Sequence, residues 1–223
     1  MKLGLVMGLG EGGRVSVDID LAREAEDLGF DSIWTSEAWG SDAISTASWI
    51  LAQTSKIKVG TGIIQMSART PALAAMTAMS LQHLSNDRFI LGIGPSGPQV
   101  IEGWHGMPYG RPLTRTREYI EIIRKIEARE SALTHNGYHY QIPKAGDGTT
   151  NLGKPLKGIL HSPAPLKIIT GTIAPAGVRV SAEVANGMIP VFMNPDRFDV
   201  FEDALNDGFA KAGGGKSLGN LDI

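Results

Sequence analysis

Short, uncharged apolar runs alternate along the chain with longer segments in which apolar and charged residues recur at helical spacing. Such runs are typical of strands buried on both faces of a parallel sheet, and the longer segments are typical of amphipathic helices. The pattern predicts strands over 2–8, 32–36, 57–64, 89–93, 166–171 and 188–193. It predicts helices over 17–30, 42–54, 71–84, 113–126, 177–185 and 196–212.

The helical segments also predict which side chains face the core. In the first helix, Leu21, Ala25 and Leu28 share one face, Ser16 or Asp18 caps the start, and Gly29 ends it. In the second helix the expected core residues are Ile44, Trp49, Ile50 and Leu51. Pro71 is expected in the first turn of the third helix.

Predicted strands begin near residues 2, 32, 57 and 88, a spacing of about 30 residues that is typical of one βα unit. Repeated βα units indicate a parallel sheet, either closed as a (β/α)8 TIM barrel or open and doubly wound. We count about six units and a stub at 221–223, so we expect an incomplete barrel. We expect one domain over 1–223, with a flexible loop at 8–13 and a surface excursion at about 127–165, in which 138–142 alternates like a small strand.

Composition narrows the function class. The chain has 21 Lys and Arg against 23 Asp and Glu, so no basic excess suggests nucleic acid as the partner. Cysteine is absent, which excludes disulfides, thiolate metal sites and cysteine nucleophiles. We find no signal sequence and no apolar run of the ~20 residues needed to cross a membrane, so we expect a soluble, cytoplasmic protein.

The strand predicted at 89–93 runs into a glycine-rich loop, where backbone N–H groups can approach a ligand closely. Gly92, Gly94 and Gly97 have the spacing of a dinucleotide fingerprint. We discount that match, because Pro98 is expected to delay the helix that the fingerprint requires on its last glycine. Packing and ligand binding stay equally open as reasons for these glycines.

Several segments together resemble the luciferase-like monooxygenase superfamily, and within it the oxidoreductases that use the deazaflavin coenzyme F420. The resemblance runs from Met1 to about Pro195 and is carried by KLGL, EAEDLGFDSIW, SEAWGSDA, KVGTGIIQMSARTP and RFILGIGPSGPQVIEGWHGMPYGRPLTRTREYIEIIR. It implies a (β/α)8 barrel, usually dimeric. It also implies hydride transfer between F420 and a small organic substrate. The alternatives are an FMN-dependent monooxygenase and a cofactor-binding barrel without catalysis.

The resemblance also implies positions for the cofactor. A bulge after the third strand, often with a non-proline cis peptide, props one face of the ring in this family, and Gly62, Ile63 and Ile64 match it. The loop after the next strand, with Ser96 and Gly97, is expected to line the same site.

Cofactor phosphate is expected at the helix start after the fifth strand, where this chain has Thr172, Ile173 and Ala174. Glu37 follows the second strand and matches an acidic position that contacts the ring, so it is our candidate catalytic residue. Better-understood relatives carry His after this acid and Glu in the later loop, where this chain has Ala38 and Gly97. The proton donor and the substrate are therefore not assigned.

Two further groups of residues have open interpretations. Arg69, Arg111, Arg115 and Arg117 either hold the acidic tail of the cofactor or pair with carboxylates of the protein. The five histidines lack ligand spacing, so we predict no metal. Trp39 and His105 are expected in loops that line the pocket, with a structural role favoured for His105.

Overall fold

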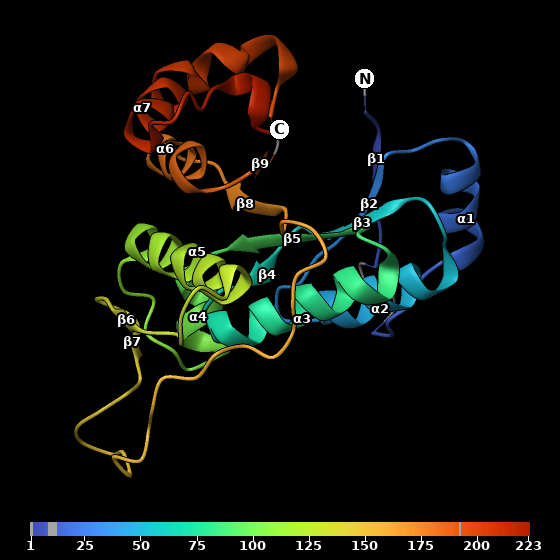
Figure 1. The fold of residues 1–223 in the computed structure, drawn as a ribbon. Helices are drawn as coiled ribbons and strands as arrows, with labels where there is room; N and C mark the ends of the chain where they lie inside the picture. The colour runs from blue at the N-terminus through green and yellow to red at the C-terminus, as the bar shows by residue number, and fades with distance from the viewer. Residues whose placement is uncertain (1, 9–12, 192) are drawn as a thin grey trace.

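Parallel strands form a curved, open sheet in the computed structural model, which describes residues 2–8, 13–191 and 193–223 (Figure 1). The predicted loop at 8–13 lies mostly outside these residues. The strands are β1 (Gly4–Val6), β2 (Ser32–Thr35), β3 (Lys58–Thr61), β4 (Ile64–Gln65), β5 (Phe89–Gly94), β8 (Ile168–Thr172) and β9 (Gly187–Pro190). Their order is β1-β2-β3-β5-β8-β9, with β4 paired to β5.

Helices follow the strands in the predicted rhythm. They are α1 (Ile19–Asp27), α2 (Ala43–Gln53), α3 (Pro71–Ser85), α4 (Pro98–Gly103), α5 (Pro112–Ala128), α6 (Pro175–Val184) and α7 (Glu202–Ala212). Short 3-10 helices cover Pro195–Phe201 and Leu218–Asn220. The prediction of about six parallel βα units is confirmed.

The strands lie side by side in chain order, without the reversal that defines a doubly wound sheet, so the doubly wound alternative is excluded. The predicted stub is also present, since Asp222 forms a parallel bridge with Gly187 beside β9. The two ends of the sheet approach each other there. Lys2 Nζ lies 3.7 Å from Asp222 Oδ1, and Figure 1 shows the N- and C-termini on the same side.

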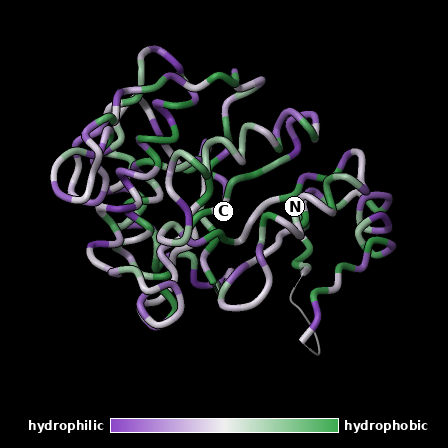
Figure 2. The backbone as a smooth tube through the Cα atoms, turned by 90° about the horizontal axis from the view of Figure 1, so that it is seen from below, coloured by the Kyte–Doolittle hydropathy of each residue, from purple (hydrophilic) through white to green (hydrophobic). Residues whose placement is uncertain are grey.

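The main hydrophobic core lies between the sheet and helices α1, α2, α3 and α5, and a second cluster joins β9 to α6 and α7. Most charged residues lie outside it. In Figure 2 the helix at the right, α1, is largely purple with short green interruptions, as expected for a helix that buries one narrow face.

The helix ends agree with the sequence prediction, whereas three of the predicted core side chains do not. Asp18 accepts the N–H of Leu21 at 3.0 Å, and Pro71 opens α3. However, Leu28 is 71% exposed, Leu21 is also exposed, and α1 instead buries Ala22 and Ala25. Trp49 is 56% exposed on α2. Our predictions for these three large side chains are wrong, because α1 approaches the sheet on alanines and Trp49 lies on the outer side of α2. The predictions for Ile50 and Leu51 are confirmed, since α2 buries both.

The prediction that Pro98 delays a helix is also wrong. Helix α4 begins at Pro98, directly after Gly97 as its N-cap. Proline is well suited to the first helical position, because the N–H that it lacks would have no partner inside the helix.

The described residues between α5 and β8 contain one hairpin, in which two strands of two residues each pair antiparallel. These strands are β6 (His135–Asn136) and β7 (Gln141–Ile142). The strand predicted over 138–142 is therefore mostly absent. The reason is local, since the backbone N–H groups of Tyr138, His139 and Tyr140 donate to the carboxylate of Glu118. No helix in the described ranges is long and apolar enough to cross a membrane.

Glu26 fastens α1 to the start of β3, and this contact generates a prediction on pH and stability. Burial raises the pKa of this carboxyl, but N–H groups of Ile57, Lys56 and Ser55 outweigh it and hold the pKa at about 2. Because this value lies below the ordinary value of 4.5, the stabilisation is present above pH 4.5 and lost as the pH falls toward 2.

We expect Glu26→Gln to lower the free energy of unfolding by about 1 kcal/mol at pH 7. The difference from wild type should shrink between pH 5 and pH 3. Urea unfolding across this range measures it, with Glu24→Gln on the exposed face as the control. An equal loss at every pH would contradict the assignment.

Candidate functional site

The inner face of the sheet carries glycines where side chains would otherwise fill a barrel. A Cβ atom on Gly60 would overlap the ring of Trp34, and one on Gly4 would lie 3.1 Å from the Trp34 Nε1 atom. The indole therefore lies across two neighbouring strands, with its Nε1–H donating to Ser32 Oγ at 3.0 Å. The same face lines a cavity of about 410 Å³ with residues from β1, β2, β5, β8 and β9.

A β-bulge separates β3 from β4. Gly60 pairs with Ile90, but Ile64 pairs with Ile93, so one extra residue lies between the two pairs. The Thr61 hydroxyl links the bulge to β5, because it donates to the carbonyl of Gly92 at 2.7 Å and accepts the N–H of the same residue at 2.9 Å.

Gly92 is necessary for this crossing. A Cβ atom there would overlap the carbonyl oxygen of Thr61, so no larger residue fits without moving the backbone. Close packing against Thr61 therefore explains why residue 92, the first of the three glycines with dinucleotide-fingerprint spacing, is glycine.

Ile63 lies at the top of the bulge, over two other glycines. A Cβ atom on Gly94 would lie 2.9 Å from Ile63 Cδ1, and one on Gly171 would lie 2.9 Å from Ile63 Cγ2. The side chain therefore spans the carboxyl ends of β5 and β8 and remains half-buried. The peptide bond between Gly62 and Ile63 is cis, as the resemblance implies, while Ile64 is buried in the core.

Glu37 is held on both carboxylate oxygens. Its Oε1 accepts the backbone N–H of Gln65 at 2.9 Å and the Arg69 Nη1 at 2.5 Å, and its Oε2 accepts the N–H of Ala43 at 3.2 Å. Arg69 also pairs with Asp42. Glu37 therefore joins the end of β2 to the bulge and to the start of α2.

Gln65 extends this network toward a histidine. Its side chain is fully buried, donates to the carbonyl of Ala38 at 2.8 Å, and lies 2.5 Å from His105 Nε2 through its Oε1. The structural role that the sequence favoured for His105 is thus supported. Trp39 is exposed and borders a hollow beside Glu37.

The loop after β5 carries Ser96 and Gly97, both half-buried at the carboxyl end of the sheet. Ser96 has a φ of 57°, in the left-handed region, and its carbonyl accepts the hydroxyl of Tyr109 at 3.1 Å. Gly97 begins α4.

Thr172, Ile173 and Ala174 lead from β8 into α6. Ala174 is the N-cap and provides no side-chain hydrogen bond to the first turn. A Cβ atom on Gly177 would overlap the Thr172 hydroxyl, so the strand end and the helix start approach closely. Ile173 is 65% exposed. Backbone N–H groups at such a helix start favour anions.

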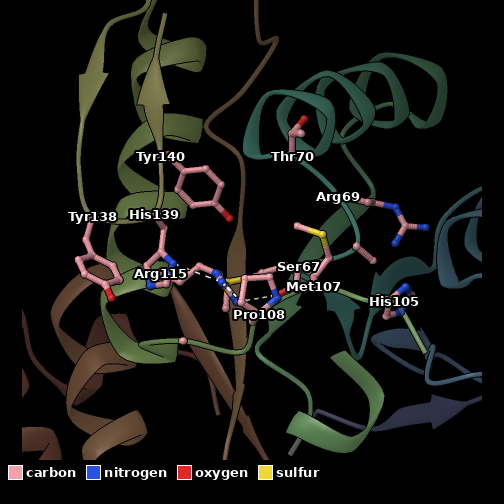
Figure 3. A pocket seen from close by; sticks show the side chains of 13 residues that line it. Ser67, Arg69, Thr70, His105, Met107, Pro108, Arg115, Tyr138, His139 and Tyr140 are labelled. Carbon is pink, nitrogen blue, oxygen red and sulfur yellow. Dashed lines mark hydrogen bonds between the residues drawn. The ribbon is translucent and has the colours of Figure 1, made fainter. Parts of the chain in front are cut away.

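The four arginines of the sequence analysis have different partners. Arg117 donates to Glu183 Oε2 through two nitrogens, and Arg69 pairs with Glu37 and Asp42. The guanidinium of Arg111 lies 4.4 Å from the ring centroid of Tyr138. Arg115 lines a separate pocket with His139 and Tyr140, shown in Figure 3.

The structure thus brings Glu37 and the bulge residues together, with Ser96, Gly97 and Thr172 on neighbouring strand ends. Sequence reasoning missed Trp34 and Gln65, and it did not anticipate that Ile63 packs on Gly171. A glycine near the end of a strand, as at Gly171, was an available signal for close backbone approach. Among the described residues, no group of three His, Asp or Glu residues has the geometry of a metal site.

Comparison with known proteins extends the sequence argument. A family model described as luciferase-like monooxygenase matches residues 6–221. A Mycobacterium tuberculosis protein, provisionally named a coenzyme F420-dependent oxidoreductase, is 45% identical over 224 residues, with 100% of this chain and 65% of that protein covered. The 5,10-methylenetetrahydromethanopterin reductase of Archaeoglobus fulgidus is 30% identical over 190 residues, with 85% of this chain and 53% of the reductase covered.

A solved structure shows the same fold. The coenzyme F420-dependent tetrahydromethanopterin reductase of Methanopyrus kandleri superimposes with a TM-score of 0.77 at 23% identity, with 100% of this chain and 64% of the reductase covered. This likeness confirms the TIM-barrel type of fold. The chain spans between about half and two thirds of the length of these relatives. The chain belongs to the luciferase-like monooxygenase family.

Proposed function

We propose that this protein is a coenzyme F420-dependent oxidoreductase that transfers hydride between the cofactor and a small organic substrate. The names of the M. tuberculosis and A. fulgidus relatives support the reaction class. A deazaflavin would supply the redox chemistry, and the protein would bind it, orient it and exclude water.

The observation that carries the proposal is the position of Ile63. Its side chain rests on Gly94 and Gly171 at the carboxyl end of the sheet, where barrel enzymes place their chemistry. It presents a half-buried aliphatic surface to the mouth of the barrel, which suits one face of a flat ring. Gly62 and Ile64 flank it in the bulge, and Ile64 anchors the segment because it is buried in the core.

We propose that the phosphate of the cofactor lies at the start of α6. Thr172 is partly buried there and Ile173 and Ala174 are exposed, and the N-cap leaves the first N–H groups of the helix without a side-chain acceptor. Ser96 and Gly97, on the adjacent strand end, would border the ring.

We propose that Glu37 contacts the edge of the ring. Its carboxylate already accepts three hydrogen bonds, which favours a positioning role over proton transfer. The prediction that Glu37 is catalytic stays a prediction.

The main rival is an FMN-dependent monooxygenase, in keeping with the family description. A non-catalytic barrel is the other alternative. We also propose that residues 1–223 form one domain with a surface excursion at 127–165, because β8, which follows the excursion, pairs with β5, which precedes it. Location in the cytoplasm, no nucleic-acid partner and no bound metal stay predictions.

Titration of the purified protein with F420 and, separately, with FMN tests the cofactor. We expect quenching of tryptophan fluorescence by F420 at micromolar concentration, because Trp34 lies beside Gly62, and at least tenfold weaker binding of FMN. Preference for FMN would favour the monooxygenase. Binding of neither would contradict the proposal.

The same titration locates the ring. Ile63→Ala should weaken F420 binding about tenfold through lost contact area, while the half-exposed site keeps the loss of stability small. Ile159→Ala, on an exposed residue of the excursion, is the matched control. Unchanged affinity in Ile63→Ala would exclude the proposed ring position.

We also propose a homodimer through α2 and α3. Trp49 and Met76 are 56% and 58% exposed, and Leu73 on α3 is exposed as well, so the two neighbouring helices present large apolar side chains to solvent. Light scattering should give about twice the chain mass of 23.7 kDa, and Met76→Glu should shift it toward the monomer. A monomeric wild-type protein would contradict this proposal.

A further inference from the structure

A second hollow lies outside the barrel mouth, between the N-terminal ends of α3 and α5 and the β6–β7 hairpin. Its volume is about 720 Å³, within the range of small-molecule sites. Figure 3 shows Tyr138, His139 and Tyr140 on the hairpin side, Arg69 and His105 on the opposite side, and Arg115 between them. We call it the Arg115 pocket.

Arg115 is only 7% exposed, yet its partners are neutral. Its Nη1 donates to Ser67 Oγ at 2.5 Å, and its Nη2 donates to the carbonyl of Pro108 at 2.9 Å and to His139 Nδ1 at 3.3 Å. Among residues 2–8, 13–191 and 193–223, no carboxylate oxygen lies within 4 Å of this guanidinium.

His139 does not supply the missing negative charge. Its Nε2 lies 3.0 Å from the carbonyl of Arg111, so Nε2 carries the hydrogen and the Nδ1 lone pair faces Arg115. Burial lowers the pKa of His139, and together with the charges of Arg115 and Arg111 it outweighs the hydrogen bond to the Arg111 carbonyl and the charge of Glu118, which favours the neutral ring.

Arg111 is exposed to solvent outside the lining, where it stacks on Tyr138, and the other charged groups around the pocket have partners. Arg69 pairs with Glu37 and Asp42, and the carboxylate of Glu118 accepts the N–H groups of Tyr138, His139 and Tyr140. A buried charge is normally paired, because its removal from water is otherwise costly. The remaining charge of the pocket is therefore the guanidinium of Arg115, which has five N–H donors and gives three to the protein.

The walls are preformed and largely apolar. Met66, Met107 and Pro108 line one part, and the rings of Tyr138 and Tyr140 line the hairpin side. Glu118 fixes the hairpin to α5 through its three backbone contacts at 2.8, 2.9 and 3.1 Å. Preformed apolar walls around one cation suit an organic anion better than a free inorganic ion.

We propose that the Arg115 pocket binds the carboxylate of an organic molecule, with Arg115 as its counter-ion and the tyrosines and methionines against its body. The carboxylate has two possible sources: a separate small carboxylic acid, or the acidic tail of a deazaflavin bound at the barrel mouth. Arg69 and His105 also border the hollow beside Glu37, so the pocket lies next to the proposed cofactor site. The first source does not depend on the proposed cofactor.

Calorimetric titrations separate the two sources. Benzoate is the probe for a free carboxylate, and benzamide is its neutral counterpart. F420 is compared with the deazaflavin riboside, which lacks the acidic tail. Each ligand is titrated into wild type, Arg115→Gln and the control Arg117→Gln, whose arginine lies on the same helix and pairs with Glu183. Met107→Trp, at an exposed position, narrows the pocket without removing a buried charge.

For a free carboxylate we expect benzoate to bind wild type at least tenfold more tightly than benzamide, and to lose about tenfold in Arg115→Gln but not in Arg117→Gln. For the cofactor tail, F420 should lose about tenfold in Arg115→Gln while the riboside is unaffected. If Arg115→Gln does not fold, Met107→Trp should show the same losses.

Either pattern supports the pocket. Benzoate and F420 affinities that are unchanged in both Arg115→Gln and Met107→Trp would overturn it, as would failure of wild type to bind either ligand. Benzoate binding that depends on Arg115 without any F420 binding would retain the pocket and reject only the proposed cofactor.

Discussion

The close crossing of the β3–β4 segment over the glycines of β5 and β8 is the constraint on which the rest of the site depends. Thr61 bonds both backbone groups of Gly92, where a Cβ atom would overlap its carbonyl. This crossing places the extra residue of the bulge at the barrel mouth and turns Ile63 across Gly94 and Gly171. A side chain on Gly92 would displace the backbone of the segment, and one on Gly94 or Gly171 would displace the side chain of Ile63, so the shape of the mouth depends on three positions that lack a side chain.

Charged side chains then hold the bulge in the position that the glycines allow. The carboxylate of Glu37 ties the bulge to β2 and α2, and Arg69 links it to Asp42. These contacts occupy both oxygens of the Glu37 carboxylate, so this acid holds strand ends together. Arg115, on α5, has only neutral hydrogen-bond partners among the described residues. The two sites therefore differ in charge: the carboxylate of Glu37 is paired within the described chain, and the guanidinium of Arg115 is not.

The sequence predicted the order of strands and helices well, because buried parallel strands are continuous apolar runs and helix caps are local signals. It failed to predict which helical side chains are buried, because that depends on how closely each helix approaches the sheet. Leu21, Leu28 and Trp49 were expected in the core, yet α1 approaches the sheet on Ala22 and Ala25, and Trp49 lies on the outer side of α2. It also missed the roles of Gly171 and Trp34, because the contact between a glycine and a side chain from a distant strand is visible only in three dimensions. The Gly62–Ile63 cis peptide was anticipated through family resemblance, not through residue patterns.

The central claim is that Ile63, supported by Gly94 and Gly171, forms the surface on which the cofactor ring rests. A crystal structure of the protein grown with saturating F420 tests it directly. The account predicts one face of the ring in van der Waals contact with Ile63, at the carboxyl ends of β5 and β8. A ring bound inside the sheet beside Trp34, or in the Arg115 pocket, would contradict it.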